Sequence, residues 1–262
     1  MINRFSGRSS IEKSGRFTFL HTHKNTMSNP YFTFKQFTIW HDKCAMKVGT
    51  DGVLLGAWAP VENCKRILDV GTGTGLIAIQ LAQRAPQANI TAVEIDKIAA
   101  NQASDNVRNS PWANRIEVIC ADFRHYTPNE RFDMIVSNPP YFINSLKCGN
   151  EQRNTARHTD ELNYNLLFSH SATLLQPKGV LAIVIPAENQ KAVIDVAGTY
   201  GYYAYRQMKL FTKPQKNCRR LLITFGFDPL HTYQEETLFI TQENGQFSEE
   251  YKALTQDFYL KI

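Results

Sequence analysis

A glycine-rich turn constrains the fold of this 262-residue chain more than any other feature. Its sequence is Asp69-Val70-Gly71-Thr72-Gly73-Thr74-Gly75, and it lies between the apolar pair Ile67-Leu68 and an amphipathic stretch. The pattern predicts a strand over 67–70 and a helix over 76–84. Glycines at such a junction tolerate a positive φ and let a ligand approach the backbone closely. We therefore expect an α/β domain with a ligand site at this turn.

Segments of strand and helix character alternate from residue 66 to about residue 226. Further strands are expected at 90–94, 116–120, 132–137, 180–185, 203–210 and 221–225. Helices are expected at 97–107, 162–175 and 187–199. The last two strands are expected to form an antiparallel pair. This order is typical of an α/β, doubly wound, mostly parallel sheet, here seven-stranded, with helices on both faces.

The segment just before the turn carries additional expected elements. Aromatic and β-branched residues dominate 31–39, which predicts a strand. Residues 47–52 predict a turn, and a short helix over 53–58 would be capped by Thr50 or Asp51. We therefore expect residues 31–262 to form one domain with a strand-turn-helix addition at its start.

Residues 1–30 differ from the rest of the chain because they are basic and lack apolar periodicity. Such composition is typical of a disordered tail, which would suit an RNA-binding arm. Alternatively, the segment is an extension foreign to the natural protein, with Met27 as the natural start. We favour the second interpretation.

Composition argues against several classes of protein. The longest apolar run, 180–185, is far shorter than the roughly 18 residues of a membrane-spanning helix. The first 30 residues contain no signal-peptide core, so we expect a cytoplasmic protein without a membrane partner. The five cysteines are scattered and include no C-x-x-C pair, so we expect no metal. The net charge of +5 suits a polyanionic partner, although a mildly basic enzyme would show it too; no obligate protein partner is evident.

Acidic residues near the glycine turn indicate which ligand it would hold. Asp69, two residues before the first glycine, would repel a pyrophosphate but attract a ligand with an ammonium and a sulfonium. Glu94, at the end of the next strand, could accept hydrogen bonds from both ribose hydroxyls. Asp122, after the third strand, could accept one from an adenine amino group. These charges favour S-adenosyl-L-methionine over a dinucleotide.

The tetrapeptide Asn138-Pro139-Pro140-Tyr141 directly follows a strand that is expected to be buried. Its prolines fix the backbone and remove two donors, which leaves an amide side chain, a bare carbonyl and an aromatic ring. The Asn138 side-chain oxygen and the Pro139 carbonyl could accept both protons of an exocyclic amine. Tyr141 could stack on a flipped base, so the motif predicts methylation of an amino group on a planar acceptor.

Together these motifs resemble class I, Rossmann-like methyltransferases of the amino-methylating kind. The flanking segments Phe34–Phe37, Cys44–Trp58 and Asp257–Lys261 look like one bacterial family, which methylates N6 of adenine 37 beside the anticodon of a valine tRNA. The resemblance implies that Thr50, Asp51, Asp69 and the glycines Gly71, Gly73 and Gly75 surround the methionine end of the cofactor. It implies the ribose for Glu94, the adenine for Asp122 and the target base for residues 138–141.

Two groups of basic residues are candidates for RNA binding. Arg153, Arg157 and His158 follow the Asn138 tetrapeptide and could contact a phosphate near the flipped base. The later cluster consists of Lys213, Lys216, Arg219 and Arg220, with Lys209 close by. A solvated helix start would explain the first group equally well, whereas RNA contact is the favoured interpretation of the later cluster over a solvated face. For Tyr202, Tyr203 and Tyr205, core packing is the favoured interpretation.

Three rival functions remain open. A protein methyltransferase acting on a glutamine amide of release factors needs equivalent chemistry, but such enzymes resemble this chain less because they carry a helical domain before the glycine turn. A DNA adenine or ribosomal guanine methyltransferase is the second rival, and no added target-recognition domain supports the DNA form. A non-catalytic RNA-binding or chaperone module is the third, and the intact set of site residues argues against it.

Overall fold

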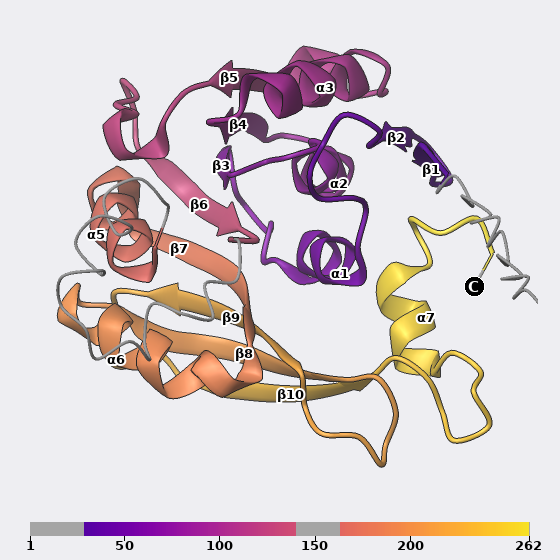
Figure 1. Ribbon diagram of the computed structural model, residues 1–262. Helices are drawn as coiled ribbons and strands as arrows, with labels where there is room; N and C mark the ends of the chain where they lie inside the picture. The colour runs from indigo at the N-terminus through magenta and orange to yellow at the C-terminus, as the bar shows by residue number, and fades with distance from the viewer. Residues whose placement is uncertain (1–28, 140–162, 262) are drawn as a thin grey trace, which may run out of the picture.

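The computed structural model describes residues 29–139 and 163–261, and its central feature is a twisted sheet flanked by helices (Figure 1). The sheet strands are β3 (Arg66–Val70), β4 (Asn89–Glu94), β5 (Ile116–Cys120), β6 (Phe132–Ser137), β7 (Leu175–Pro186), β8 (Tyr203–Phe211), β9 (Arg220–Gly226) and β10 (Gln234–Phe239). Their order is β10-β8-β9-β7-β6-β3-β4-β5. β9 is antiparallel to both of its neighbours, whereas the other pairs are parallel.

The strand order creates a switch point beside β3. The chain proceeds from β3 through β4 to β5 on one side, and then returns to β6 and β7 on the other side. Connections on the two sides of β3 therefore diverge at its carboxyl end. In open α/β sheets a crevice forms at such a point, and ligands bind there. The glycine turn follows β3 and Asn138 follows β6, so the fold brings both to this crevice.

Helices cover both faces of the sheet. They are α1 (Thr50–Trp58), α2 (Leu76–Arg84), α3 (Lys97–Arg108), α5 (Tyr164–Leu174), α6 (Gln190–Thr199) and α7 (Glu249–Thr255), with the short 3-10 helices η1 (Ala113–Arg115), η2 (Phe123–His125) and η3 (Ala187–Asn189). One core cluster joins one face of the sheet to α1, α2 and α7, and another joins the opposite face to α5 and α6. Each fully buried Leu or Ile stabilises these layers by about 1.5–3 kcal/mol.

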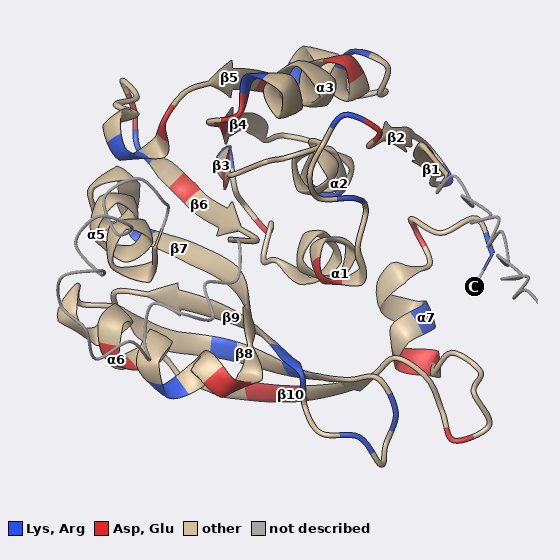
Figure 2. Ribbon diagram, viewed as in Figure 1, with Lys and Arg blue, Asp and Glu red and all other residues tan. Residues whose placement is uncertain are grey.

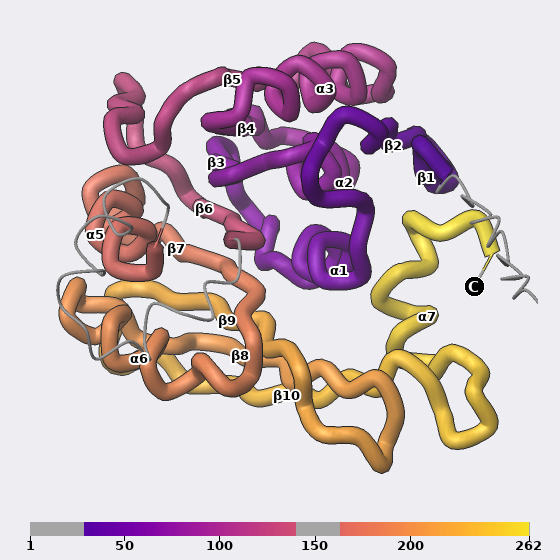
Figure 3. Tube along the Cα trace, viewed as in Figure 1, coloured from indigo at the N-terminus to yellow at the C-terminus, as the bar shows by residue number. Residues whose placement is uncertain are grey.

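The N-terminal and C-terminal segments pack against each other (Figure 3). Strands β1 (Tyr31–Thr33) and β2 (Thr38–Trp40) form a small antiparallel hairpin. The backbone N–H of Lys35 donates to the carbonyl of Phe258 at 2.7 Å, and the ring of Phe32 lies edge-on to Tyr259. The C-terminal segment after α7 therefore holds the hairpin in place, which fixes the loop that follows β2.

The fold class predicted from the sequence is confirmed, with differences in detail. The sheet has eight strands among the described residues instead of the expected seven, because polar Gln234–Phe239 adds an edge strand. The stretch 31–39 forms a hairpin with a turn and not one strand. Helix α1 begins at Thr50, with Gly49 as its N-cap and no side-chain cap, so the expected cap by Thr50 or Asp51 was wrong. The antiparallel pairing of β8 with β9 is confirmed.

Candidate active site

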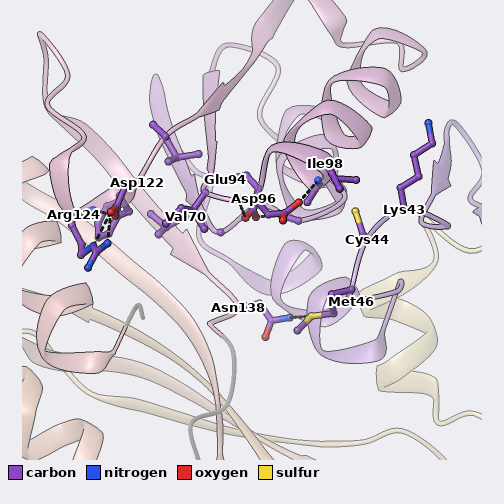
Figure 4. Close-up of a pocket in the computed structure, with 18 of the residues that line it drawn as sticks. Lys43, Cys44, Met46, Val70, Glu94, Asp96, Ile98, Asp122, Arg124 and Asn138 are labelled. Carbon is purple, nitrogen blue, oxygen red and sulfur yellow. Dashed lines mark hydrogen bonds and ion pairs between the residues drawn. The ribbon is translucent and has the colours of Figure 1, made fainter. Parts of the chain in front are cut away.

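A cavity of about 580 Å³ lies at the carboxyl ends of β3, β4 and β6 (Figure 4). The glycine turn and Glu94 form its floor, and the loop after β2 forms one wall with Lys43, Cys44 and Met46. Asp122 and Arg124, at the start of η2, line one end, and Asn138 and Leu166 also line the cavity. The cavity therefore brings together Gly71, Gly73, Glu94, Asp122 and Asn138, which the sequence analysis selected from separate segments.

The glycine turn owes its shape to backbone that side chains rarely adopt. Gly71, Gly73 and Gly75 have φ of 69°, 56° and 80°. Open space surrounds the positions that a Cβ would occupy at Gly71 and Gly73, both of which line the cavity. At Gly75 a Cβ would instead lie 3.4 Å from the Cβ of Ala103 on α3. The first two glycines thus expose backbone to a ligand, and the third allows close packing of helices.

Glu94 fixes the turn and faces the cavity. One of its carboxylate oxygens accepts from the backbone N–H of Gly73 and the other from that of Asp96, each at 2.9 Å. The residue is only 9% exposed and lines the cavity. Because a carboxylate oxygen can accept more than one hydrogen bond, both oxygens keep acceptor capacity for hydroxyls of a ligand. The arrangement fits the ribose-binding role expected from the sequence.

Asp69 lies beneath the glycine turn and does not line the cavity. Its Oδ2 accepts from the hydroxyl of Thr72 at 2.6 Å and from the N–H of Ala78 at 3.2 Å. Its Oδ1 is buried and has no hydrogen-bond partner among the described residues. Burial raises the pKa of Asp69 to about 7, against the lowering effect of these two hydrogen bonds. Asp69 therefore supports the turn from below. It could act on a cationic ligand in the cavity by longer-range electrostatic attraction and not by direct contact.

Asp122 and Arg124 form an ion pair at one end of the cavity. The guanidinium donates to Asp122 Oδ2 from Nε at 2.8 Å and from Nη2 at 2.6 Å. The backbone N–H of Arg124 donates to Oδ1, which makes Asp122 the N-cap of η2. The side-chain hydrogen bond from Arg124 lowers the pKa of the Asp122 carboxyl. An ionised acceptor is thus held at the end where the sequence analysis expected the adenine of a cofactor.

Asn138 stands at the end of β6, where the strand is tied to its neighbour. The hydroxyl of Ser137 donates to the carbonyl of Val70 at 2.9 Å, which joins the carboxyl ends of β6 and β3. The Asn138 side-chain nitrogen lies 3.8 Å from the sulfur of Met46. In Figure 4 the amide oxygen of Asn138 lies on the side away from Met46. Pro139 is buried, and Pro140 and Tyr141 lie outside the described residues.

Thr50 and Asp51, expected near the methionine end of a cofactor, lie in the first turn of α1 and do not line the cavity. Asp51 accepts from Nε of Arg220 at 2.8 Å, and both side chains are about three-tenths exposed. The pair connects the start of α1 to the start of β9. Arg220, expected to bind RNA, therefore has a carboxylate partner that sequence analysis did not identify.

The other basic residues of the late cluster occupy the loop between β8 and β9 (Figure 2). Lys213, Lys216 and Arg219 are exposed there. Lys209 instead contacts Glu235 on the neighbouring strand β10 at 2.6 Å. Arg153, Arg157 and His158 lie outside the described residues. Tyr202 packs in the core as expected and bonds to Ser171, whereas Tyr203 is exposed.

Several cavity residues were missed by sequence analysis. Met46 belongs to an irregular loop, and although its segment resembles the family, nothing in the local sequence indicated that its side chain lines the cavity. Ile95 and Ile98 line the cavity and are both 59% exposed. A large apolar residue on the solvent side of an amphipathic helix was a usable signal for Ile98. Leu166, in α5, carried no signal because the predicted helix gave no indication of which turn faces the site.

Cys44 lines the cavity and is a potential nucleophile by residue type. Burial, followed by the charges of Glu94, Asp96 and Asp42, raises the pKa of the Cys44 thiol to about 11, so Cys44 is unsuited to act as a nucleophile near neutral pH. Within 29–139 and 163–261, no group of His, Cys, Asp or Glu could hold a metal ion. No helix in those ranges is long and apolar enough to cross a membrane.

Solved structures of other proteins share this fold. A predicted O-methyltransferase from Agrobacterium tumefaciens aligns with a TM-score of 0.64 and 19% sequence identity, covering 79% of this chain and 96% of that one. The methyltransferase CcbJ from Streptomyces caelestis aligns with a TM-score of 0.52 and 12% identity, covering 69% and 96%. The fold of this chain is thus the class I methyltransferase fold.

Sequence comparison identifies the family within that class. The family described as methyltransferase small domain matches residues 47–204. A Bacteroides thetaiotaomicron protein named tRNA1(Val) (adenine(37)-N6)-methyltransferase is 54% identical over 237 residues, covering 90% of this chain and 100% of that protein. A Haemophilus influenzae protein of the same name is 45% identical, covering 88% and 99%. This chain therefore belongs to the family of tRNA1(Val) (adenine(37)-N6)-methyltransferases, which confirms the resemblance seen in the sequence.

Proposed function

We propose that this chain transfers a methyl group from S-adenosyl-L-methionine to N6 of adenine 37 in a valine tRNA. The observation that carries the proposal is the similarity to proteins named for this reaction. Five relatives are 50–54% identical, and each alignment covers 90% of this chain. The site supplies an independent reason, because an amide acceptor follows a buried strand beside a glycine-lined cavity.

The donor set of the cavity fits S-adenosyl-L-methionine. When bound, this cofactor supplies an electrophilic methyl group on a sulfonium. Gly71 and Gly73 would expose backbone to it, and Glu94 would accept hydrogen bonds from its ribose hydroxyls. Asp122 would accept one from its adenine amino group. Asp69, whose buried Oδ1 has no partner among the described residues, would add negative charge below a cationic ligand.

Asn138 and Pro139 would bind the amine that receives the methyl group. Their two oxygens can accept both N–H groups, which would orient the nitrogen lone pair toward the methyl group. As positive charge develops on nitrogen, both acceptors stabilise it more strongly than they stabilise the neutral amine. The nitrogen loses a proton after it becomes cationic, so no general base is required. By analogy with the motif, Tyr141 would stack on the flipped base.

The loop between β8 and β9 would contact the tRNA. Ser137 pairs with Ile183 on β7, and three residues further along β7 Pro186 pairs with Arg220 at the start of β9. The loop therefore leaves the sheet at the same strand ends as Asn138. Lys213, Lys216 and Arg219 would contact phosphates and release counterions. Arg153, Arg157 and His158 remain candidates for phosphates near the target base. Arg220 would act mainly through Asp51.

We also propose that residues 31–262 form a single domain and that the protein acts in the cytoplasm, where its tRNA substrate is found. The two core clusters share the strands of one sheet, which supports the single domain.

A side-by-side transfer assay tests this function against its rivals. The protein is incubated with cofactor carrying a labelled methyl group and with tRNA, ribosomal RNA, DNA or release factor. The proposal predicts label in tRNA alone. Label on a glutamine of the release factor, with unlabelled tRNA, would instead assign the protein-methylating function, since Asn138 and Pro139 would hold a glutamine amide equally well. No transfer to any substrate would favour the binding module.

A further inference from the structure

The loop between β2 and α1 is held over the cavity by two buried amides of α3. The Gln102 side chain donates to Asp42 at 2.6 Å and accepts from the backbone N–H of Lys43 at 3.2 Å. One turn along the helix, Asn106 bonds to both the N–H and the carbonyl of Trp40. Asn106 also donates to the carbonyl of Thr74 in the glycine turn at 2.8 Å.

These bonds give the loop a defined position relative to the floor of the site. Gln102 and Asn106 are 3% and 1% exposed, so their bonds are shielded from water. A buried amide that lost its partners would cost about 1–3 kcal/mol, which favours the arrangement observed. The start of the loop is therefore fixed to the same helix that packs against the glycine turn, and residues 43–46 extend from this anchor along the cavity.

Met46 lies at the end of this wall nearest to Asn138. Although it lines the cavity, it is 51% exposed. Its sulfur lies 3.8 Å from the side-chain nitrogen of Asn138, and Figure 4 shows the two side chains pointing toward each other. Because one amide group carries both the nitrogen that contacts Met46 and the oxygen that would accept from an amine, a base held at that oxygen would lie on the same side of the cavity as the Met46 thioether.

We propose that Met46 is a substrate-contacting residue whose thioether packs on a face of the methylated base. This inference rests on the proposed function, because it takes the substrate to be an adenine. Met is suited to the role since its unbranched side chain adapts its shape and its sulfur makes favourable contacts with aromatic rings. The exposed apolar surface of Met46 would be covered by the base, and its contact with the Asn138 nitrogen would leave the amide oxygen directed to the amine.

The location of Met46 also distinguishes it from the cofactor-binding residues. Glu94 is bonded to the glycine turn through the N–H of Gly73, whereas Met46 contacts Asn138 at the end of β6. Removing the Met46 side chain should therefore weaken RNA binding without weakening cofactor binding. A residue that merely covered the cofactor would show the opposite result.

The test compares Met46→Ala and Met46→Leu with the unchanged protein, using tRNA transcripts that contain the target adenine. Met46→Ala is expected to raise the KM for tRNA about two- to tenfold, the range of a sulfur–aromatic contact. Met46→Leu keeps the apolar bulk and should recover most of this loss. The Kd for S-adenosyl-L-methionine, measured by calorimetry, should stay within about twofold in both, which also establishes that the variants are folded.

Leu230→Ala is the matched control, because Leu230 is a highly exposed apolar residue on the loop between β9 and β10. It should leave both constants unchanged. An unaltered KM for tRNA in Met46→Ala overturns the proposal, and so does an equal rise in KM and in the cofactor Kd. Failure of the proposed function is recognised separately, since the unchanged protein would then transfer no methyl group to tRNA.

Discussion

Replacing Asp69 with Asn should remove a pH dependence of folding stability that originates under the glycine turn. Burial raises the pKa of Asp69 from 3.8 to about 7 in the folded protein, whereas the unfolded chain releases this proton near 3.8. Between these two values the folded state holds a proton that the unfolded state has lost. The contribution of Asp69 to stability is therefore complete below about pH 4, falls as the pH rises towards about 7, and stays low above that.

The size of this effect follows from the shift in pKa. Each pH unit between the two pKa values changes the free energy of unfolding by about 1.4 kcal/mol. From about pH 5 to about pH 8 the loss attributable to Asp69 is therefore roughly 2–3 kcal/mol. Asp69→Asn keeps an oxygen for the Thr72 hydroxyl and the Ala78 N–H, but it cannot ionise. Its amide nitrogen would take the place of the unpartnered Oδ1 and would be a buried donor without an acceptor. At low pH the variant should therefore be less stable than the unchanged protein.

Urea unfolding at several pH values between about 5 and about 8 would measure the effect. The difference in unfolding free energy between the unchanged protein and Asp69→Asn cancels the contribution of groups that both share. The unfolding free energy of the unchanged protein minus that of Asp69→Asn should fall by roughly 2–3 kcal/mol as the pH rises. Asp195→Asn, at an exposed carboxylate paired with Lys191, should show no such trend. Parallel pH profiles for the unchanged protein and Asp69→Asn would refute the reasoning.

Three further predictions concern binding and the loop. Glu94→Ala should lower the affinity for S-adenosyl-L-methionine at least about tenfold, because it removes acceptors for the ribose and the support of the turn. Calorimetry on the folded variant measures this Kd, and an unchanged value would contradict the assignment of Glu94. Charge reversal at Lys216 and Arg219 should weaken tRNA binding and flatten its salt dependence, while an unaltered slope would make the loop an ordinary solvated surface. Gln102→Leu should lower stability by about 1–3 kcal/mol in urea unfolding and raise the KM for tRNA; normal values would mean that Gln102 does not position the loop.

Elements with strong local patterns could be predicted from the sequence. The bounds of α2, β5 and β6 agree with the expected ranges, because apolar runs or amphipathic periods end at clear breakers there. The edge strand β10 could not be predicted. Its sequence Gln234-Glu235-Glu236-Thr237 is polar, and it is held by pairing with β8 and by ion pairs to Arg206 and Lys209. Tertiary contacts outweigh β propensity at such an edge.

The site shows the same division between local and distant information. Gly71, Gly73, Glu94 and Asn138 were recognisable because each lies at or just after the carboxyl end of a strand, and parallel strands bring those ends together. The ion pair between Asp51 and Arg220 was not recognisable, since 169 residues separate its members. Asp51 and Arg220 were therefore assigned separately to cofactor and RNA binding, and only the folded structure shows that they pair with each other.

The loop anchors were beyond sequence reasoning for another reason. Gln102 and Asn106 look like ordinary polar positions of a helix surface, yet both are buried by the hairpin and its following loop. An amide on a helix carries no sign of which distant backbone it will bind. Met46 was likewise invisible, because no local pattern indicates that a loop residue faces the end of a strand 92 residues away.

The most direct test of the proposed reaction is mass spectrometry of digested tRNA after incubation with the protein and S-adenosyl-L-methionine, with Asn138→Ala in parallel. The account predicts N6-methyladenosine at adenine 37 of valine tRNA with the unchanged protein. With Asn138→Ala it predicts a rate of product formation that is about 10²- to 10³-fold lower, at a nearly unchanged Kd for the cofactor. The reason is that the lost acceptor acts mainly in the transition state. Methylation elsewhere than on an adenine amino group, or undiminished product from Asn138→Ala, would contradict it.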